Sequence, residues 1–251
     1  MKSLLLVLLL SLCSFDSKAA FSFSDGFESG STSGWDATVP RPVIKGPCSS
    51  TLNVIDQTPM PKPRPMSDVY FLEATICDAA PGPVALVEDD SPNDESSFRA
   101  MFDFNPNTAN IALNGEIVIF RALSFTPNLP VVDISLFNNM GNLEIRAYGY
   151  NDAGSRAGSI SFQLPDLNTH RIGIGWSASS GPGSNDGVLE LELDQIPAMS
   201  SISNLDNDTL SVDFVHLGNI SSANNSGTIW FDQYDSDDES LPVSLMSFDV
   251  E

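Results

Sequence analysis

Hydrophobic and polar side chains alternate with a strict period of two between His170 and Asp194. A turn rich in glycine and serine divides this stretch into two segments, and each keeps its own alternation. The apolar positions are Ile172, Ile174, Trp176, Leu189, Leu191 and Leu193. Such alternation is typical of a β-strand with one buried face and one wet face. The stretch therefore predicts a hairpin that packs on a second layer, because an isolated hairpin is only marginally stable in water.

Similar short segments recur along most of the chain and are separated by turn residues. They lie at 51–56, 69–76, 98–104, 116–123, 131–137, 142–150, 158–164, 209–218, 227–235 and 243–250, with an edge strand at 84–88. Apolar residues at helical spacing are not sustained in any window. About a dozen short strands predict an all-β fold, an antiparallel two-sheet jelly-roll β-sandwich. We expect one such domain over residues 21–251.

The stretch 57–68 interrupts this pattern with four prolines. Proline has no backbone N–H and cannot pair inside a sheet, so these residues predict an extended surface loop inserted into the domain.

The first twenty residues differ from the rest of the chain. Lys2 is followed by an apolar run at 4–12 and by a small-x-small site ending at Ala19. This pattern indicates a secretory signal peptide over residues 1–20, cleaved near Ala19 or Ala20, and the run is too short to span a bilayer. The alternative is a lipoprotein signal acylated at Cys13, which needs a small residue before the cysteine, where Leu12 stands. We expect a secreted or cell-surface protein whose mature chain does not insert into a membrane.

Two cysteines, Cys48 and Cys77, remain after the signal peptide is removed. An even pair in an exported chain predicts a disulfide, which here would close the proline-rich loop.

The chain has a formal net charge of −22 over 251 residues. A surface this negative repels phosphate backbones and anionic lipids, so nucleic acid and membrane surfaces are disfavoured as partners. Two interpretations remain: solubility outside the cell, and binding of a divalent cation, since calcium takes oxygen ligands.

Aromatic residues on polar strand faces are candidates for stacking on sugar rings. Tyr148 and Tyr150 share a strand face with Arg146, and Trp230 lies out of phase with its apolar neighbours. We predict these four as glycan-binding residues; the alternative is that each ring simply packs on a neighbouring strand.

The two histidines, His170 and His216, are far apart in the sequence. We expect both to be structural, because neither the pattern of a serine triad nor that of a zinc site surrounds them.

Several motifs carry a family resemblance in order along residues 21–238. They are DGFESG followed by Trp35, then FRAMFDF, HRIGIGW, DGVLELELD, VDFVHLG and SGTIWFDQYDS. Together they resemble the concanavalin A-like lectin/glucanase superfamily, specifically the laminin-G-like jelly rolls of exported bacterial proteins; residues 40–95 depart most. The resemblance indicates the fold well and the function poorly, because the superfamily holds lectins, glycosidases, adhesion modules and structural domains.

Two kinds of site follow from this resemblance. It implies a structural calcium ion that ties the first strand to the last; the matching positions are Asp25, Glu28 and Asp232, which could instead be a turn cap and surface residues. It also suggests a glucanase-like acid row, here Glu190, Glu192 and Asp194, because residues two apart on a strand share a face. The family order is Glu-x-Asp-x-Glu, whereas this chain has Glu-x-Glu-x-Asp, so a solvated strand face is the alternative.

The sequence therefore favours an exported, non-catalytic β-sandwich that binds glycans or extracellular matrix components. A glycoside hydrolase that uses the acid row is the first alternative, and a structural surface protein is the second.

Overall fold

The computed structural model describes residues 22–40, 50–58, 60, 66, 68–77, 84–126, 128–194, 200–222 and 224–237. The predicted signal peptide, the strand expected at 243–250, Cys48 and most of the proline-rich stretch lie outside these residues. No helix in the described part of the chain is long and apolar enough to cross a membrane.

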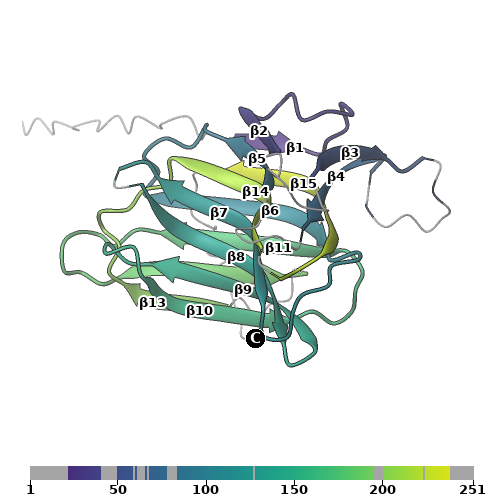
Figure 1. Ribbon diagram of the computed structural model, residues 1–251. Coiled ribbons are helices and arrows are strands. Elements are labelled where there is room, and N and C mark those ends of the chain that lie inside the picture. The colour runs from purple at the N-terminus through teal and green to yellow at the C-terminus, as the bar shows by residue number, and fades with distance from the viewer. Residues whose placement is uncertain are drawn as a thin grey trace, which may run out of the picture.

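The described chain folds into two antiparallel β-sheets that lie face to face (Figure 1). Sheet A has the order β13 (Ser200–Leu205), β12 (Gly187–Leu193), β11 (His170–Ser177), β6 (Ser97–Asn105), β15 (Gly227–Asp237), β4 (Tyr70–Ile76) and β3 (Leu52–Asp56), and β1 (Ser22–Asp25) also pairs with β15. Sheet B has the order β10 (Arg156–Gln163), β9 (Asn142–Tyr150), β8 (Leu129–Asn139), β7 (Glu116–Ser124), β14 (Phe214–Ser222), β5 (Ala85–Asp89) and β2 (Ala37–Pro40). The predicted jelly-roll β-sandwich is confirmed.

The hairpin predicted from the alternation forms from β11 and β12, and its apolar side chains face the interior. Ile172 pairs with Leu193 and Ile174 with Leu191, and all four are buried in the core. Beside the hairpin, β9 of sheet B and β13 of sheet A approach closely, because a β-carbon added at Gly149 would lie 3.0 Å from a methyl carbon of Leu205. A side chain at Gly149 would require Leu205 to shift.

Three strand predictions differ from the structure. The strand expected at 84–88 is not an edge strand, since β2 pairs with β5 on its far side. Residues 209–213 form a turn with an isolated bridge at Val212, and β14 begins only at Phe214. Two strands were not expected: β2, which has only four residues, and β13, whose residues are mostly polar. Both end their sheets, where one neighbour and little apolar surface are enough to hold a strand.

Candidate binding face on the outer side of sheet B

Five polar side chains form one continuous row across five neighbouring strands of sheet B. Glu88 of β5 is opposite His216 of β14, which is opposite Arg121 of β7. Arg121 is opposite Asp133 of β8, which is opposite Tyr148 of β9. The residues that alternate with them, such as Leu217 and Ile134, are buried in the core. The row therefore lies on the outer face of sheet B, pointing away from sheet A.

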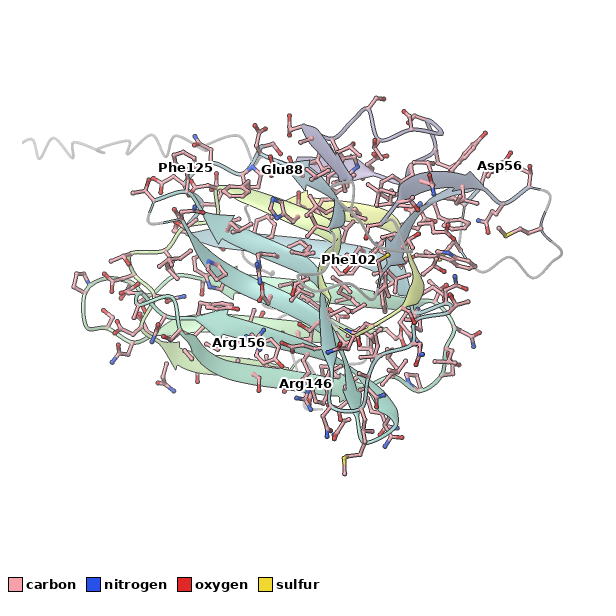
Figure 2. All side chains as sticks on the ribbon, viewed as in Figure 1. Asp56, Glu88, Phe102, Phe125, Arg146 and Arg156 are labelled. Carbon is pink, nitrogen blue, oxygen red and sulfur yellow. The ribbon has the colours of Figure 1, made fainter. Side chains whose placement is uncertain are left out.

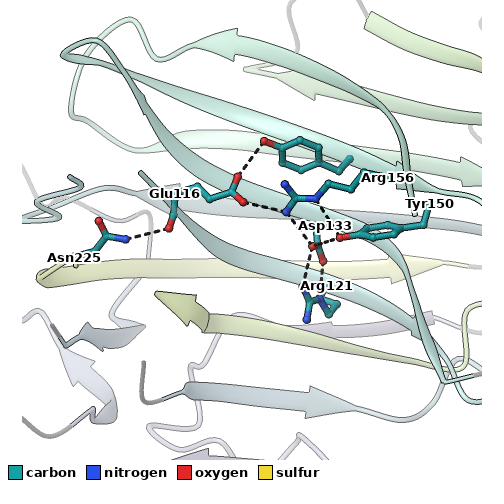
Figure 3. Close-up of polar contacts among 7 residues, drawn as sticks. Glu116, Arg121, Asp133, Tyr150, Arg156 and Asn225 are labelled. Atoms are coloured by element: carbon teal, nitrogen blue, oxygen red, sulfur yellow. Dashed lines mark hydrogen bonds and ion pairs between the residues drawn. The ribbon is translucent and has the colours of Figure 1, made fainter. Parts of the chain in front are cut away.

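Asp133 is the centre of this row and is fully buried. Its carboxylate accepts hydrogen bonds from Arg121 Nε at 2.6 Å and Nη2 at 2.8 Å, which is a bidentate ion pair. The Tyr150 hydroxyl donates a third at 2.7 Å (Figure 3). The hydrogen bond with Asp133 raises the pKa of Arg121. Burial raises the pKa of the Tyr150 phenol, so it remains a donor at neutral pH.

Arg156 of the outer strand β10 links this centre to a second carboxylate. Its Nη2 donates to Glu116 Oε1 at 3.0 Å, and its Nε donates to the Tyr150 hydroxyl at 3.3 Å. The guanidinium lies 3.7 Å from the ring centroid of Tyr148, whose hydroxyl donates to Glu116 Oε2 at 3.0 Å. Burial alone would lower the pKa of Arg156, but Tyr150 and Glu116 raise it above the ordinary value. The hydroxyls of both tyrosines thereby belong to the same hydrogen-bond network.

Arg146 lies two residues before Tyr148 on β9 and is held in the same way. Its Nε and Nη2 donate to Glu144 Oε2 at 3.0 and 2.9 Å, and its guanidinium lies 3.4 Å from the ring centroid of Phe137. Burial would raise the pKa of Glu144, but Asn139 and Arg146 hold it below the usual value. Tyr148, Tyr150 and Arg146 therefore share one face, as the alternation in β9 predicts.

His216 is part of this face, which the sequence did not reveal. Its Nε2 lies 2.7 Å from Glu88 Oε2. Burial lowers the pKa of His216, although the hydrogen bond and charge of Glu88 oppose the shift. Within 209–218, His216 shares its alternation with Leu210, Val212 and Phe214, so the sequence does not place it on a polar face. The strand order brings it between Glu88 and Arg121.

A cavity of about 420 Å³ opens beside Glu88, at the end of the row. Phe214, at the start of β14, and Phe125, in the loop between β7 and β8, also line it. Figure 2 shows Glu88 and Phe125 at the same end of the sheet, with Arg156 and Arg146 farther along.

Trp230 does not join the other predicted glycan-binding residues. It belongs to β15 of sheet A, where its Nε1 donates to Glu73 Oε2 at 2.9 Å and its ring packs on Phe71 with centroids 4.8 Å apart. The two sheets alternate independently, so a sequence pattern cannot tell which polar strand faces belong to the same surface.

The acid row of β12 lies on the outer face of sheet A. Glu190 is opposite Gly175 and Glu192 opposite Gly173, and burial raises the pKa of Glu190 while the charge of Arg99 opposes this shift. Asp194 follows the strand, and its two oxygens contact His170 Nδ1 at 2.7 Å and Arg171 N at 2.9 Å. His170 thus fastens the end of the hairpin.

The three predicted calcium ligands lie near β1 and β15, which pair with each other. Both oxygens of Asp25 accept hydrogen bonds, from Phe27 N at 2.7 Å and Trp35 Nε1 at 2.8 Å. Glu28 Oε1 accepts from two backbone amides at the start of β4, and Asp232 is fully buried. These carboxylates act as protein hydrogen-bond acceptors, and the calcium ion stays a prediction.

A different group of acids has the spacing of a metal site in the described part of the chain. Asp152, Asp206 and Asp208 each bring one oxygen within 4.8 Å of the others. Asp152 Oδ1 already accepts hydrogen bonds from Thr209 N at 3.0 Å and Oγ1 at 2.7 Å, so this group also has a structural use.

Cys77 is fully buried directly after β4. Cys48 lies outside the described residues, so the Cys48–Cys77 disulfide stays a prediction.

No protein-family model matches the chain, and no curated protein matches it. Among solved structures it is similar to the cellulose-induced protein Cip1, with a TM-score of 0.56 and 13% identity over 87% of this chain and 98% of that one. The receptor-binding domain of botulinum neurotoxin type G gives a TM-score of 0.46 at 14% identity, over 77% of this chain and 44% of that one. Alginate lyase vAL-1 from Chlorella virus gives a TM-score of 0.43 at 13% identity, over 68% of this chain and 86% of the lyase. The likeness to Cip1 shows the β-sandwich fold, and the two lower scores carry no functional argument.

Proposed function

We propose that this protein is an exported, non-catalytic module of the laminin-G-like type that binds glycans or matrix components through the outer face of sheet B. The observation that carries the proposal is the in-register row Glu88, His216, Arg121, Asp133 and Tyr148. Sugar hydroxyls need donors and acceptors at fixed places, and rigid strands supply them better than loops.

The hydrogen bonds and ion pairs among these side chains favour binding, because they order the side chains before a ligand arrives. Arg121, Arg156 and Tyr150 are each held by at least one hydrogen bond to another member of the network. A ligand therefore does not have to immobilise them, which lowers the entropic cost of association. The half-buried ring of Tyr148 adds apolar surface beside these polar groups, as sugar rings require, whereas Tyr150 is buried and contributes through its hydroxyl.

The hydrolase alternative finds less support on sheet A. Asp194, the last acid of the row, is engaged with His170 and the Arg171 amide. Glu190 and Glu192 face glycines on β11, which bring no ring against which a sugar could stack.

Binding of cello-oligosaccharides and other neutral glycans, measured by calorimetry, tests the proposal. Cip1 is by its name a cellulose-induced protein, which is the reason to begin with β-glucans. Arg156→Ala should weaken binding by about ten-fold or more, because truncating this arginine removes hydrogen-bond donors and the contact that holds the Tyr148 ring.

Arg171→Ala is the matched control. Arg171 lies on sheet A, pairs with Asp103 and has a side-chain exposure of 33%, against 38% for Arg156. This variant should bind like the parent protein. Equal loss in both variants, or no binding of any glycan by the parent, would refute the proposal.

A further inference from the structure

The cavity beside Glu88 combines aromatic rings with carboxylates. It has a volume of about 420 Å³ and lies where β5 and β7 end and β14 begins. Phe125 is 74% exposed at this cavity, and the Phe214 ring lies 5.5 Å from the ring of His216. A cavity lined by aromatic side chains together with a few polar groups is the usual make-up of a ligand site.

The carboxylates of the cavity are Glu88, Asp90 and Asp213. Asp213 is held in place, because its two oxygens accept hydrogen bonds from the backbone amides of Asp94 at 2.9 Å and Phe125 at 2.5 Å. A side-chain hydrogen bond with Asp36 raises the pKa of Asp90, as expected where like charges crowd together. The described residues that line the cavity include no arginine or lysine.

A positively charged group fits this lining in two ways. It would relieve the repulsion among the carboxylates, and the faces of the phenylalanine rings attract a cation through their quadrupoles. A uronate or sulfate would meet repulsion from the same carboxylates. The formal net charge of −22 also favours a cationic partner.

The cavity is continuous with the polar row, because Glu88 belongs to both. We propose that it receives the ammonium group of an amino sugar at one end of a glycan that lies along the outer face of sheet B. The inference rests on the proposed function and narrows its ligand to glycans that contain free, non-acetylated amino sugars.

Glucosamine oligomers and N-acetylglucosamine oligomers of equal length are the probes, because they share a backbone and differ in charge. The parent protein should bind the glucosamine form about ten-fold more tightly at low salt, and added salt should reduce this ratio. Asp90→Asn and Phe125→Ala should bring the ratio close to one while leaving the affinity for the acetylated form within about two-fold.

Two control variants separate the cavity from general attraction to a negative protein. Glu190→Gln removes one negative charge on sheet A, and Leu167→Ala removes another exposed apolar side chain. Both should keep the preference for the glucosamine form. If Glu190→Gln reduces it as much as Asp90→Asn, or if the parent protein shows no preference, the inference is overturned.

Glucosamine as a monosaccharide distinguishes this inference from the proposed function. Its binding should depend on Asp90 and Phe125 and not on Arg156. If neutral oligomers bind in an Arg156-dependent way and amino sugars are not preferred, the glycan-binding face is supported and the amino-sugar site in the cavity is refuted. Glucosamine binding that depends on the cavity, with no Arg156-dependent glycan binding, would refute the proposed function and the placement of the glycan along sheet B, and would leave only the ammonium site in the cavity.

Discussion

The outer faces of the two sheets are built from the same alternation and carry different chemistry. On sheet B, Arg121, Arg146 and Arg156 each form an ion pair with a carboxylate of the same face. On sheet A, Glu190 and Glu192 of β12 are opposite glycines of β11, and the ion pair of this face joins Arg171 to Asp103. Charge therefore builds a connected network on sheet B, whereas the acids of β12 on sheet A have no ionic partner opposite them on β11. Register across strands, more than composition, decides which outcome a polar face has.

The largest effect is expected for Asp133→Ala, at the centre of the sheet B network. The substitution leaves a largely buried Arg121 without its bidentate partner, and the free energy of unfolding should fall by about 3 kcal/mol. Urea denaturation measures the change. A loss below about 1 kcal/mol would show that the network does not depend on Asp133.

Tyr150→Phe tests the hydroxyl of Tyr150 in the same network. It removes the 2.7 Å bond to Asp133 and the longer 3.3 Å bond from Arg156 Nε, while the two bonds from Arg121 to Asp133 remain. The expected loss is about 1 kcal/mol, the usual net value of a hydrogen bond. Tyr148→Phe is the comparison, since its bond to Glu116 is more exposed and should cost less. A larger loss of stability for Tyr148→Phe than for Tyr150→Phe would mean that the centre of the network lies at Glu116.

The pH dependence of stability tests His216. Because burial lowers its pKa in the folded protein, the unfolded chain binds more protons at this residue between the two pKa values. The contribution of His216 to the free energy of unfolding is complete above its pKa in the unfolded chain, about 6.5. It is lost as the pH falls through the lower pKa of the folded protein. Melting temperatures of the parent protein should therefore fall more between about pH 7.5 and about pH 5 than those of His216→Gln. Equal slopes would contradict this assignment.

The smallest effect is expected on sheet A. Glu190→Gln removes a partly buried charge whose pKa is raised by burial, with the charge of Arg99 opposing. Stability at neutral pH should stay within about 0.5 kcal/mol of the parent or rise slightly. A loss as large as that of Asp133→Ala would remove the contrast between the two faces.

Much of the fold could be predicted from the sequence because alternation is a local property. It identified the strands of the central hairpin and the shared face of Tyr148, Tyr150 and Arg146. It placed a strand over most of β14 and β15 but missed β2 and β13, because β2 has only four residues and β13 is mostly polar, so neither carries a clear periodic signal. Those two strands form because a neighbouring strand offers free backbone groups to them.

The sequence by itself determined that alternating segments must bury one side, and hence that two sheets enclose a common core. Only the tertiary structure decided that His216 lies between Glu88 and Arg121, that Trp230 faces away from the tyrosines, and that Asp133 gathers Arg121 and Tyr150. The physical reason is that alternation sets the side of a strand on which a residue lies, whereas strand order and register set its neighbours. Those neighbours come from segments far apart in the chain, so no local pattern encodes them.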